Sequence, residues 1–159
     1  MNLFINDGDT VYRLASPDEI IGSAKRIIEE RFGERLTIES PKDALEYIQS
    51  QIATLEHEAF SVLFLDNRHR VISFDVISRG TIDQAAVYPR EILKEALRYN
   101  ACAVLCAHNH CSGVVSPSEA DKRITKRLKT ALEMIDVRIL DHFIVSGTQS
   151  YSFAEHGEL

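Results

Sequence analysis

The segment Ala107-His108-Asn109-His110-Cys111-Ser112-Gly113 decides the fold, because it joins an apolar run at 101–107 to a segment with helical periodicity. A short apolar run that ends at turn residues is typical of a buried strand. On an extended backbone, side chains two residues apart point to the same side, which brings both imidazoles together. On a helix, where each residue turns by about 100°, the same side chains would diverge. The segment therefore predicts two histidines that can bind one cation at a strand end.

A third ligand is predicted a short distance downstream. Ser116-Pro117-Ser118-Glu119 has the pattern of a capping box with proline at the first helical position, so Asp121 falls in the first turn of a helix. An acidic residue in a first turn also has a structural explanation, since it suits the helix dipole. Two imidazoles and one carboxylate would leave a tetrahedral Zn²⁺ with one position for water, which a catalytic site needs.

Hydrolysis at such a centre also needs a general base and a donor for the developing oxyanion. Ser118 is a candidate oxyanion donor beside Asp121, although serine is equally an ordinary residue at a helix start. The nearest upstream bases are Glu56 and Glu58, which precede a predicted strand at 59–65. By position in the sequence, either glutamate could be the general base.

Composition limits the classes of protein to consider. The 159 residues fit one domain with a small appended helical piece, and 45% apolar with 26% charged residues is typical of globular proteins. A net charge of −6 argues against sequence-independent binding of phosphate backbones. No apolar run approaches the roughly 20 residues of a membrane span, and the first residues lack a signal-peptide pattern. With an odd number of cysteines, reduced thiols are expected. We therefore predict a cytoplasmic protein with no membrane partner.

The remaining pattern predicts an α/β fold, a central mixed β-sheet flanked by helices. Residues 1–15 read as an irregular lead or a short strand, and helices follow from a capping box at 16–19 to Phe32, with Gly33 at its end, and from 41 to 52. The rest of the chain is predicted to form a hairpin at 59–65 and 71–77, a loop at 80–83, a helix from 89 to 100, the 101–107 strand, a helix from 117, and strands at 137–145 and 151–153. Residues 1–53 are predicted as an N-terminal helical segment of unknown role, and residues 54–159 as the domain with the site.

Several motifs occur in the order found in one known family. Its metal motif is a glutamate followed downstream by His-x-His, seven residues, Ser, two residues and Asp, and His108-Asn109-His110, Ser118 and Asp121 match each step. Further agreement lies in Gly80-Thr81-Ile82-Asp83, Tyr88-Pro89-Arg90-Glu91, Ser112-Gly113, Pro117-Ser118, Asp141-His142 and Ser152-Phe153-Ala154-Glu155-His156-Gly157. From about Glu56 to its end, the chain resembles the RadC-like JAB/MPN proteins, which carry the JAMM motif.

This resemblance implies a zinc-dependent metallohydrolase that cleaves a peptide or isopeptide bond, on a fold similar to that of cytidine deaminases. It implies His108, His110 and Asp121 as the zinc ligands and Ser118 as the oxyanion stabiliser. It also implies Glu58 as the base, because the family places its glutamate two residues before an aromatic residue that opens the strand, here Phe60. The expected partner is a protein or peptide substrate.

Two positions near the motif call for separate interpretation. Cys111 stands where the family usually has proline, and it could pack, coordinate the metal or be oxidised; packing is the default for a cysteine. His142 could be another ligand or could form a hydrogen bond with Asp141. We favour a supporting role for His142, because strand alternation puts only one of these two neighbours on a given face.

Other functions are compatible with parts of the same pattern. A zinc deaminase would need His-x-Glu and Pro-Cys-x-x-Cys, and a TIM barrel typically needs about 250 residues. The alternative of a different class is a non-catalytic scaffold or a DNA-repair-associated nucleic-acid-binding module. The basic run Lys122, Arg123, Lys126, Arg127 and Lys129 encourages the nucleic-acid interpretation but is equally a solvated helix face. Nucleic-acid binding, the substrate and the oligomeric state stay open.

Overall fold

The computed structural model describes residues 4–6, 12–32, 36–80 and 87–159, and contacts divide the chain into the units Met1–Leu36 and Thr37–Leu159. In the first unit, strands β1 (Phe4–Asn6) and β2 (Tyr12–Leu14) pair antiparallel and helix α1 (Pro17–Phe32) follows. The predicted capping box at its start is confirmed, because Ser16 N donates to Glu19 Oε2 at 2.9 Å and Glu19 N donates to Ser16 Oγ at 3.3 Å. Gly33 and residues 81–83, for which a helix end and a loop were predicted, lie outside the described residues.

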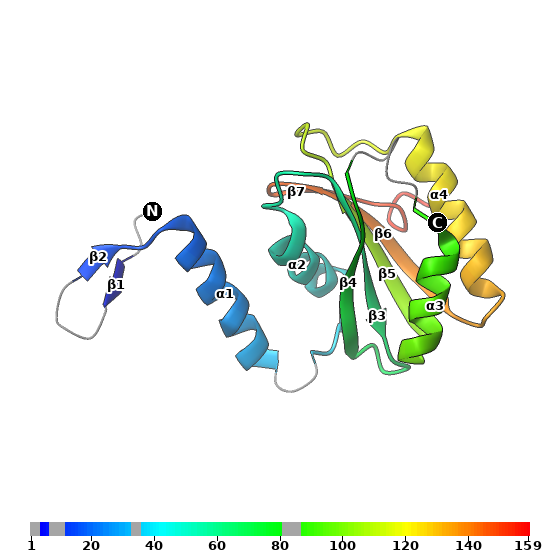
Figure 1. Ribbon diagram of the computed structural model, residues 1–159, viewed down its shortest axis with the longest axis horizontal. Helices are drawn as coiled ribbons and strands as arrows, with labels where there is room; N and C mark the ends of the chain where they lie inside the picture. The colour runs from blue at the N-terminus through cyan, green and yellow to red at the C-terminus, as the bar shows by residue number, and fades with distance from the viewer. Residues whose placement is uncertain (1–3, 7–11, 33–35, 81–86) are drawn as a thin grey trace. The chain divides into compact units, whose positions relative to one another are not determined.

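The second unit contains a five-stranded mixed sheet in the order β4-β3-β5-β6-β7 (Figure 1). Its strands are β3 (Ala59–Leu65), β4 (Val71–Arg79), β5 (Ala103–Asn109), β6 (Arg138–Ser146) and β7 (Gln149–Ser152). β3 runs antiparallel to β4 and β5, β5 runs parallel to β6, and β6 runs antiparallel to β7. The predicted α/β fold with a central mixed sheet is confirmed.

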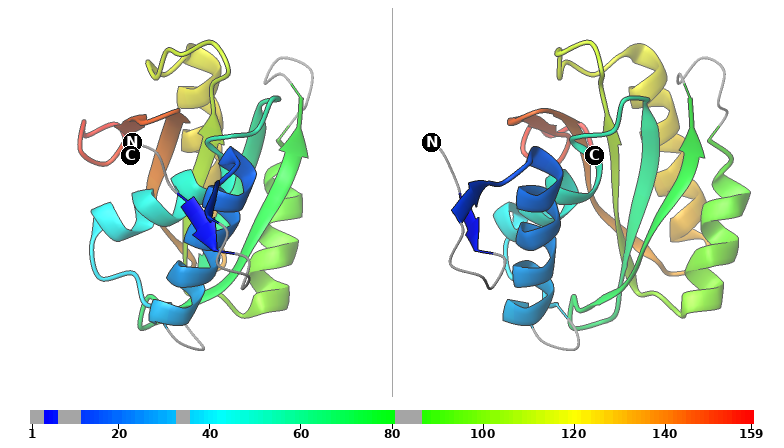
Figure 2. Two further views of the ribbon diagram at one scale, coloured as in Figure 1. Left: turned by 90° about the vertical axis from the view of Figure 1, so that its left-hand side faces the viewer. Right: turned by 60° about the vertical axis from the view of Figure 1, so that its left-hand side comes forward.

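Helices cover both faces of this sheet (Figure 2). α3 (Pro89–Tyr99) and α4 (Glu119–Glu133) lie on one face, and α2 (Pro41–Ile52) lies on the other, against β5 and β6. Ala44, Ile48 and Ile52 are the buried residues of α2, four residues apart along one side of the helix. α2, which the sequence analysis groups with residues 1–53, therefore falls in the same unit as the sheet. No helix among the described residues has the length and apolar character required to cross a bilayer.

The face covered by α3 and α4 carries the functional side chains. Val104 and Cys106 of β5 are buried there with side chains of β3, α3 and α4. His108 points to the same face, because it follows Cys106 by two residues along the strand. β5 starts at Ala103 rather than at the predicted 101, since Ala101 N still bonds to Ala96 O at 2.9 Å in the end of α3. The strand ends at Asn109, two residues beyond the predicted end, and so includes His108.

The start of α4 also differs from the prediction. The helix begins at Glu119 with Ser118 as its N-cap, so Pro117 lies outside it. Asp121 N donates to Ser118 Oγ at 3.2 Å, and Ser118 N donates to the Asp121 carboxylate at 2.8 Å. This capping box lies two residues downstream of the predicted one, because Asp121 closes it in place of Glu119. As a result, the helix start itself fixes the carboxylate of Asp121.

Candidate metal centre

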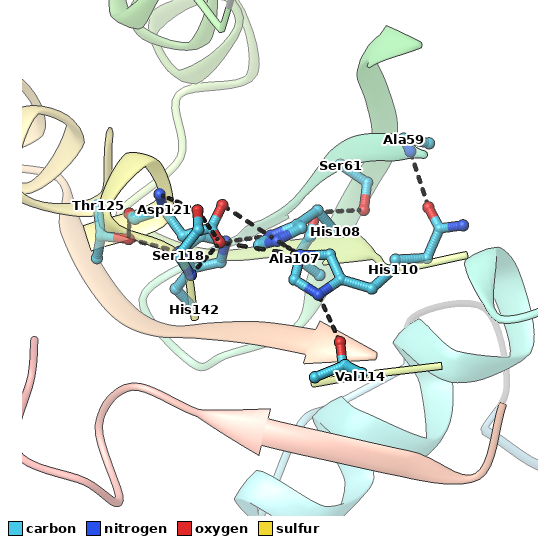
Figure 3. A network of polar contacts seen from close by, with 11 residues as sticks. Ala59, Ser61, Ala107, His108, His110, Val114, Ser118, Asp121, Thr125 and His142 are labelled. Carbon is cyan, nitrogen blue, oxygen red and sulfur yellow. Dashed lines mark hydrogen bonds and ion pairs between the residues drawn. The ribbon is translucent and has the colours of Figure 1, made fainter. Parts of the chain in front are cut away.

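Three side chains meet at the carboxyl end of β5 (Figure 3). His108 Nε2 lies 2.9 Å from His110 Nε2 and 3.3 Å from Asp121 Oδ1, and His110 Nε2 lies 3.8 Å from Asp121 Oδ2. His108 and Asp121 are fully buried, whereas the side chain of His110 is 13% exposed. The fold thus brings together the three residues that the sequence names as metal ligands, and the group could hold one metal ion.

Two side chains behind the centre determine the tautomer of His108. Thr125 Oγ1 lies 2.6 Å from the carbonyl oxygen of Asp121 and 2.6 Å from His142 Nδ1, while His142 Nε2 lies 2.9 Å from His108 Nδ1. A carbonyl oxygen only accepts and a hydroxyl has one proton, so Thr125 donates to Asp121 and accepts from His142. Burial, reinforced by the neighbouring His108, holds the pKa of His142 well below its ordinary value. The neutral His142 ring therefore accepts a hydrogen bond at Nε2 from the Nδ1–H group of His108.

The same argument assigns the tautomer of His110. Its Nδ1 lies 2.6 Å from the carbonyl oxygen of Val114 and must donate to it. His108 and His110 thus both present an Nε2 lone pair to the centre, and Asp121 Oδ1 is buried with no hydrogen-bond partner among the described residues. Three acceptors in one buried space repel one another unless they share a cation. A divalent metal ion would satisfy all three acceptors at once.

Asp121 is held in its ionised form. Its Oδ2 accepts the hydroxyl of Ser118 at 2.7 Å and the amide of Ser118 at 2.8 Å. Burial alone would raise the pKa of this carboxyl, but His108 and the two donors of Ser118 outweigh it and hold the pKa well below its usual range. The hydroxyl that the sequence analysis assigns to an oxyanion is therefore bonded to a ligand carboxylate in this structure.

The predicted base, Glu58, immediately precedes the neighbouring strand β3. Phe60 pairs with His108 across β3 and β5, and its ring stacks on the imidazole with a centroid distance of 6.2 Å and an interplanar angle of 11°. Glu58 is half-buried two residues before Phe60, which by strand alternation puts it on the same side as His108. Its carbonyl oxygen accepts Gly80 N at 2.8 Å. Glu56 is exposed in the bend before the strand and lines a hollow beside His110.

The ring of His142 supports the centre from behind His108. Its hydrogen bond with Asp141 is made by the backbone, since His142 N donates to Asp141 Oδ1 at 2.7 Å. Asp141 points to the opposite face, where its carboxylate accepts Ser152 Oγ and Ala154 N. Burial raises the pKa of Asp141 despite these bonds. Thr125 was missed, although a threonine four residues after Asp121 on a helix can bond back to its carbonyl. Its contact with His142 depends on how α4 packs on β6.

Cys111 is exposed, and its sulfur makes two long contacts. Its Sγ lies 3.8 Å from the carbonyl oxygen of Leu55 and 3.7 Å from Asn109 Nδ2. Asn109 in turn accepts Ala59 N at 2.7 Å and donates to the carbonyl oxygen of His57 at 2.9 Å. Cys111 is not one of the three residues grouped around the centre, and packing as its role stays a prediction.

Comparison with known proteins identifies the family. The model of the RadC-like JAB domain matches residues 38–158. The chain belongs to the RadC-like JAB domain family. This agrees with the resemblance drawn from the motifs, and the match begins next to the boundary between the two units.

Its curated relatives carry the name UPF0758 protein. One from Vibrio cholerae is 52% identical over 140 residues, which are 88% of this chain and 88% of the relative. One from Leptothrix cholodnii is 49% identical over 140 residues, 88% of this chain and 63% of the relative, and one from Pseudomonas fluorescens is 46% identical over 147 residues, 92% of this chain and 66% of the relative. The RadC-like chain thus spans about two thirds of the length of the last two proteins.

Proposed function

We propose that this RadC-like protein is a zinc-dependent hydrolase of the JAMM type that cleaves a peptide or isopeptide bond. The observation that carries the proposal is the convergence of two imidazole lone pairs and the unpaired Oδ1 of Asp121 in one buried space. Imidazole-rich sites suit zinc, and three protein ligands leave a fourth position for water or substrate. The resemblance to JAMM proteins supports hydrolysis of an amide.

In this proposal each side chain has a separate task. A zinc ion held by His108, His110 and Asp121 would polarise the scissile carbonyl and lower the pKa of a water molecule. Glu58 would accept a proton from the attacking water at its carboxylate and return it to the leaving nitrogen. Ser118 is exposed, so its hydroxyl could turn from Asp121 to the developing oxyanion while its amide keeps holding Oδ2.

A scaffold or nucleic-acid-binding function is less well supported. Lys122 of the basic run forms an ion pair with Glu158 at 3.0 Å, and the chain as a whole carries a net charge of −6. A scaffold would gain nothing from three converging acceptors, which cost stability when no cation joins them. An association with DNA repair and a cytoplasmic location stay predictions from the sequence.

The direct test is the metal content and the metal dependence of hydrolysis. Purified protein is expected to contain about one zinc ion per chain, as a three-ligand site holds. Plasma emission spectrometry measures the metal, and mass spectrometry of a digested peptide pool measures cleavage. Chelation should remove both zinc and cleavage, and stoichiometric zinc should restore both. Mg²⁺ should not substitute, because it requires octahedral oxygen ligands. Protein that stays free of zinc after incubation with it would overturn the proposal.

Removal of the Thr125 hydroxyl should weaken metal binding. In Thr125→Val the acceptor of His142 Nδ1 is lost, so nothing fixes the tautomer that leaves His108 Nε2 free. Loss of such an outer-shell partner typically costs 10- to 100-fold in metal affinity, about the effect expected here. Competition with a chromophoric chelator measures it. Thr130→Val is the matched control, because Thr130 also donates to a carbonyl four residues back, that of Lys126, but on the exposed side of α4. Equal affinities in the two variants would contradict the role of Thr125.

A further inference from the structure

Two hollows flank the candidate metal centre. One has a volume of about 240 Å³ and is lined by Asp121 together with Phe60, Ile124, Arg123 and Arg127. The other has a volume of about 390 Å³ and is lined by His110 with Asn109, Cys111 and Glu56. Because one hollow touches Asp121 and the other touches His110, an extended substrate bound across the centre would place a group in each.

The hollow on the Asp121 side has two positive charges at its edge. Arg123 and Arg127 lie one turn apart on α4 and so share a side of the helix. Both are exposed, and neither forms an ion pair with any residue that the structure describes. Lys122 beside them does have such a partner in Glu158. Two like charges at this spacing destabilise a helix, and an anion between them would remove the repulsion.

Among the described residues, the rest of the lining is Asp121 and the apolar side chains of Phe60, Val87, Ala120 and Ile124. Asp121 belongs to the candidate metal centre, where a bound metal ion would offset its charge. A guanidinium group presents its N–H donors in a plane that matches the two oxygens of a carboxylate. A small hollow with an apolar wall and two guanidinium groups therefore suits a carboxylate on a short aliphatic chain. A nucleic-acid backbone would instead need a row of phosphate contacts along the surface.

We propose that Arg123 and Arg127 form a subsite for a carboxylate of the substrate. The protein then prefers peptides that carry an acidic side chain or a free C-terminus at one fixed position from the scissile bond. This inference rests on the proposed function, because the substrate that fills the subsite is the amide cleaved at the centre.

The test compares cleavage of peptides that differ only in one carboxylate. A pool with glutamate or glutamine at each position, synthesised with free and with amidated C-termini, is digested by the zinc-loaded protein and read by mass spectrometry. The wild type should favour glutamate, or the free C-terminus, at one position by about tenfold, as a charge-assisted hydrogen-bonded pair supplies. In R123Q/R127Q this ratio should fall to about one, the value expected without that pair.

The matched control is K126Q/K129Q, which removes two positive charges from the same helix but outside the hollow. It should keep the preference of the wild type. Three results would overturn the subsite. The wild type could show no preference for a carboxylate, R123Q/R127Q could keep that preference, or the control could lose it to the same extent as R123Q/R127Q.

A binding measurement separates this inference from the proposed function. Metal-free protein is titrated with glutarate and, separately, with inorganic phosphate, while NMR follows the arginine Nε–H groups and the amides of residues 119–127. We expect saturable shifts with glutarate in the wild type and in K126Q/K129Q, and their loss in R123Q/R127Q. Glutarate binding of this kind without peptide cleavage by any variant would refute the hydrolase and support the subsite. Shifts with phosphate alone, or no shifts with glutarate, would overturn the subsite.

Discussion

Replacement of Asp121 with asparagine is expected to abolish zinc binding and to lower the stability of the metal-free protein. The amide oxygen of asparagine can accept the two donors of Ser118 in place of Oδ2. The metal-free protein still loses stability, because the pKa of Asp121 is held below its usual range in the folded state and the ionised carboxylate therefore favours folding. Loss of the negative charge at the helix start adds about 0.3–1 kcal/mol to this cost.

Thermal unfolding, followed by circular dichroism in EDTA and in excess zinc, checks this result. In EDTA, Asp121→Asn should unfold a few degrees below the wild type, since 1 kcal/mol corresponds to about 4 °C for a domain of this size. With free zinc at 100 times its dissociation constant, the wild type should gain about 2.7 kcal/mol and the variant nothing. Glu119→Gln removes a carboxylate from the same turn without touching the centre, and it should respond to zinc like the wild type. An equal response to zinc in Asp121→Asn would remove Asp121 from the ligands.

The metal centre could be predicted from sequence as far as its chemistry depends on neighbours along the chain. Two histidines separated by one residue at the end of a strand must point the same way, and the structure brings His108 and His110 together. Asp121 was placed correctly in the first turn of a helix, even though the capping box was predicted two residues too early. Both Ser116 and Ser118 are good N-caps, and Pro117 is acceptable at or before the first helical position. Local pattern therefore located the helix start to within two residues.

The supporting residues could not be predicted in the same way. Thr125 and His142 meet only because β5 pairs in parallel with β6, which sets His142 opposite Cys106, and because α4 packs on β6. Neither the register of a parallel pair nor the rotation of a helix on a sheet can be read from spacing. For the same reason, the two exposed arginines of α4 appeared in the sequence as a solvated helix face, and only the packing around Phe60 and Asp121 shows that they border a hollow.

Glu58→Gln is expected to retain about one zinc ion per chain and to lower kcat by about 10²- to 10⁴-fold, the usual contribution of a general base. Glutamine keeps the size of the side chain and its ability to accept a hydrogen bond, but it cannot take a proton from water. Zinc content should not change, because Glu58 is outside the group of three side chains around the centre. Plasma emission spectrometry and steady-state kinetics on a cleaved peptide measure the two quantities on the same preparation.

Glu56→Gln is the matched variant, since it removes the same charge two residues earlier in the chain. Glu56 is exposed in a bend, whereas Glu58 is half-buried on the side of the sheet that carries His108 and its stacked Phe60. A carboxylate that must hold a proton near a buried centre is better placed at the second position, so Glu56→Gln should keep nearly all activity. Full activity in Glu58→Gln with loss in Glu56→Gln would move the role to the hollow beside His110. Loss of zinc from Glu58→Gln would instead make Glu58 a ligand, and full activity in both variants would require a base from another part of the chain.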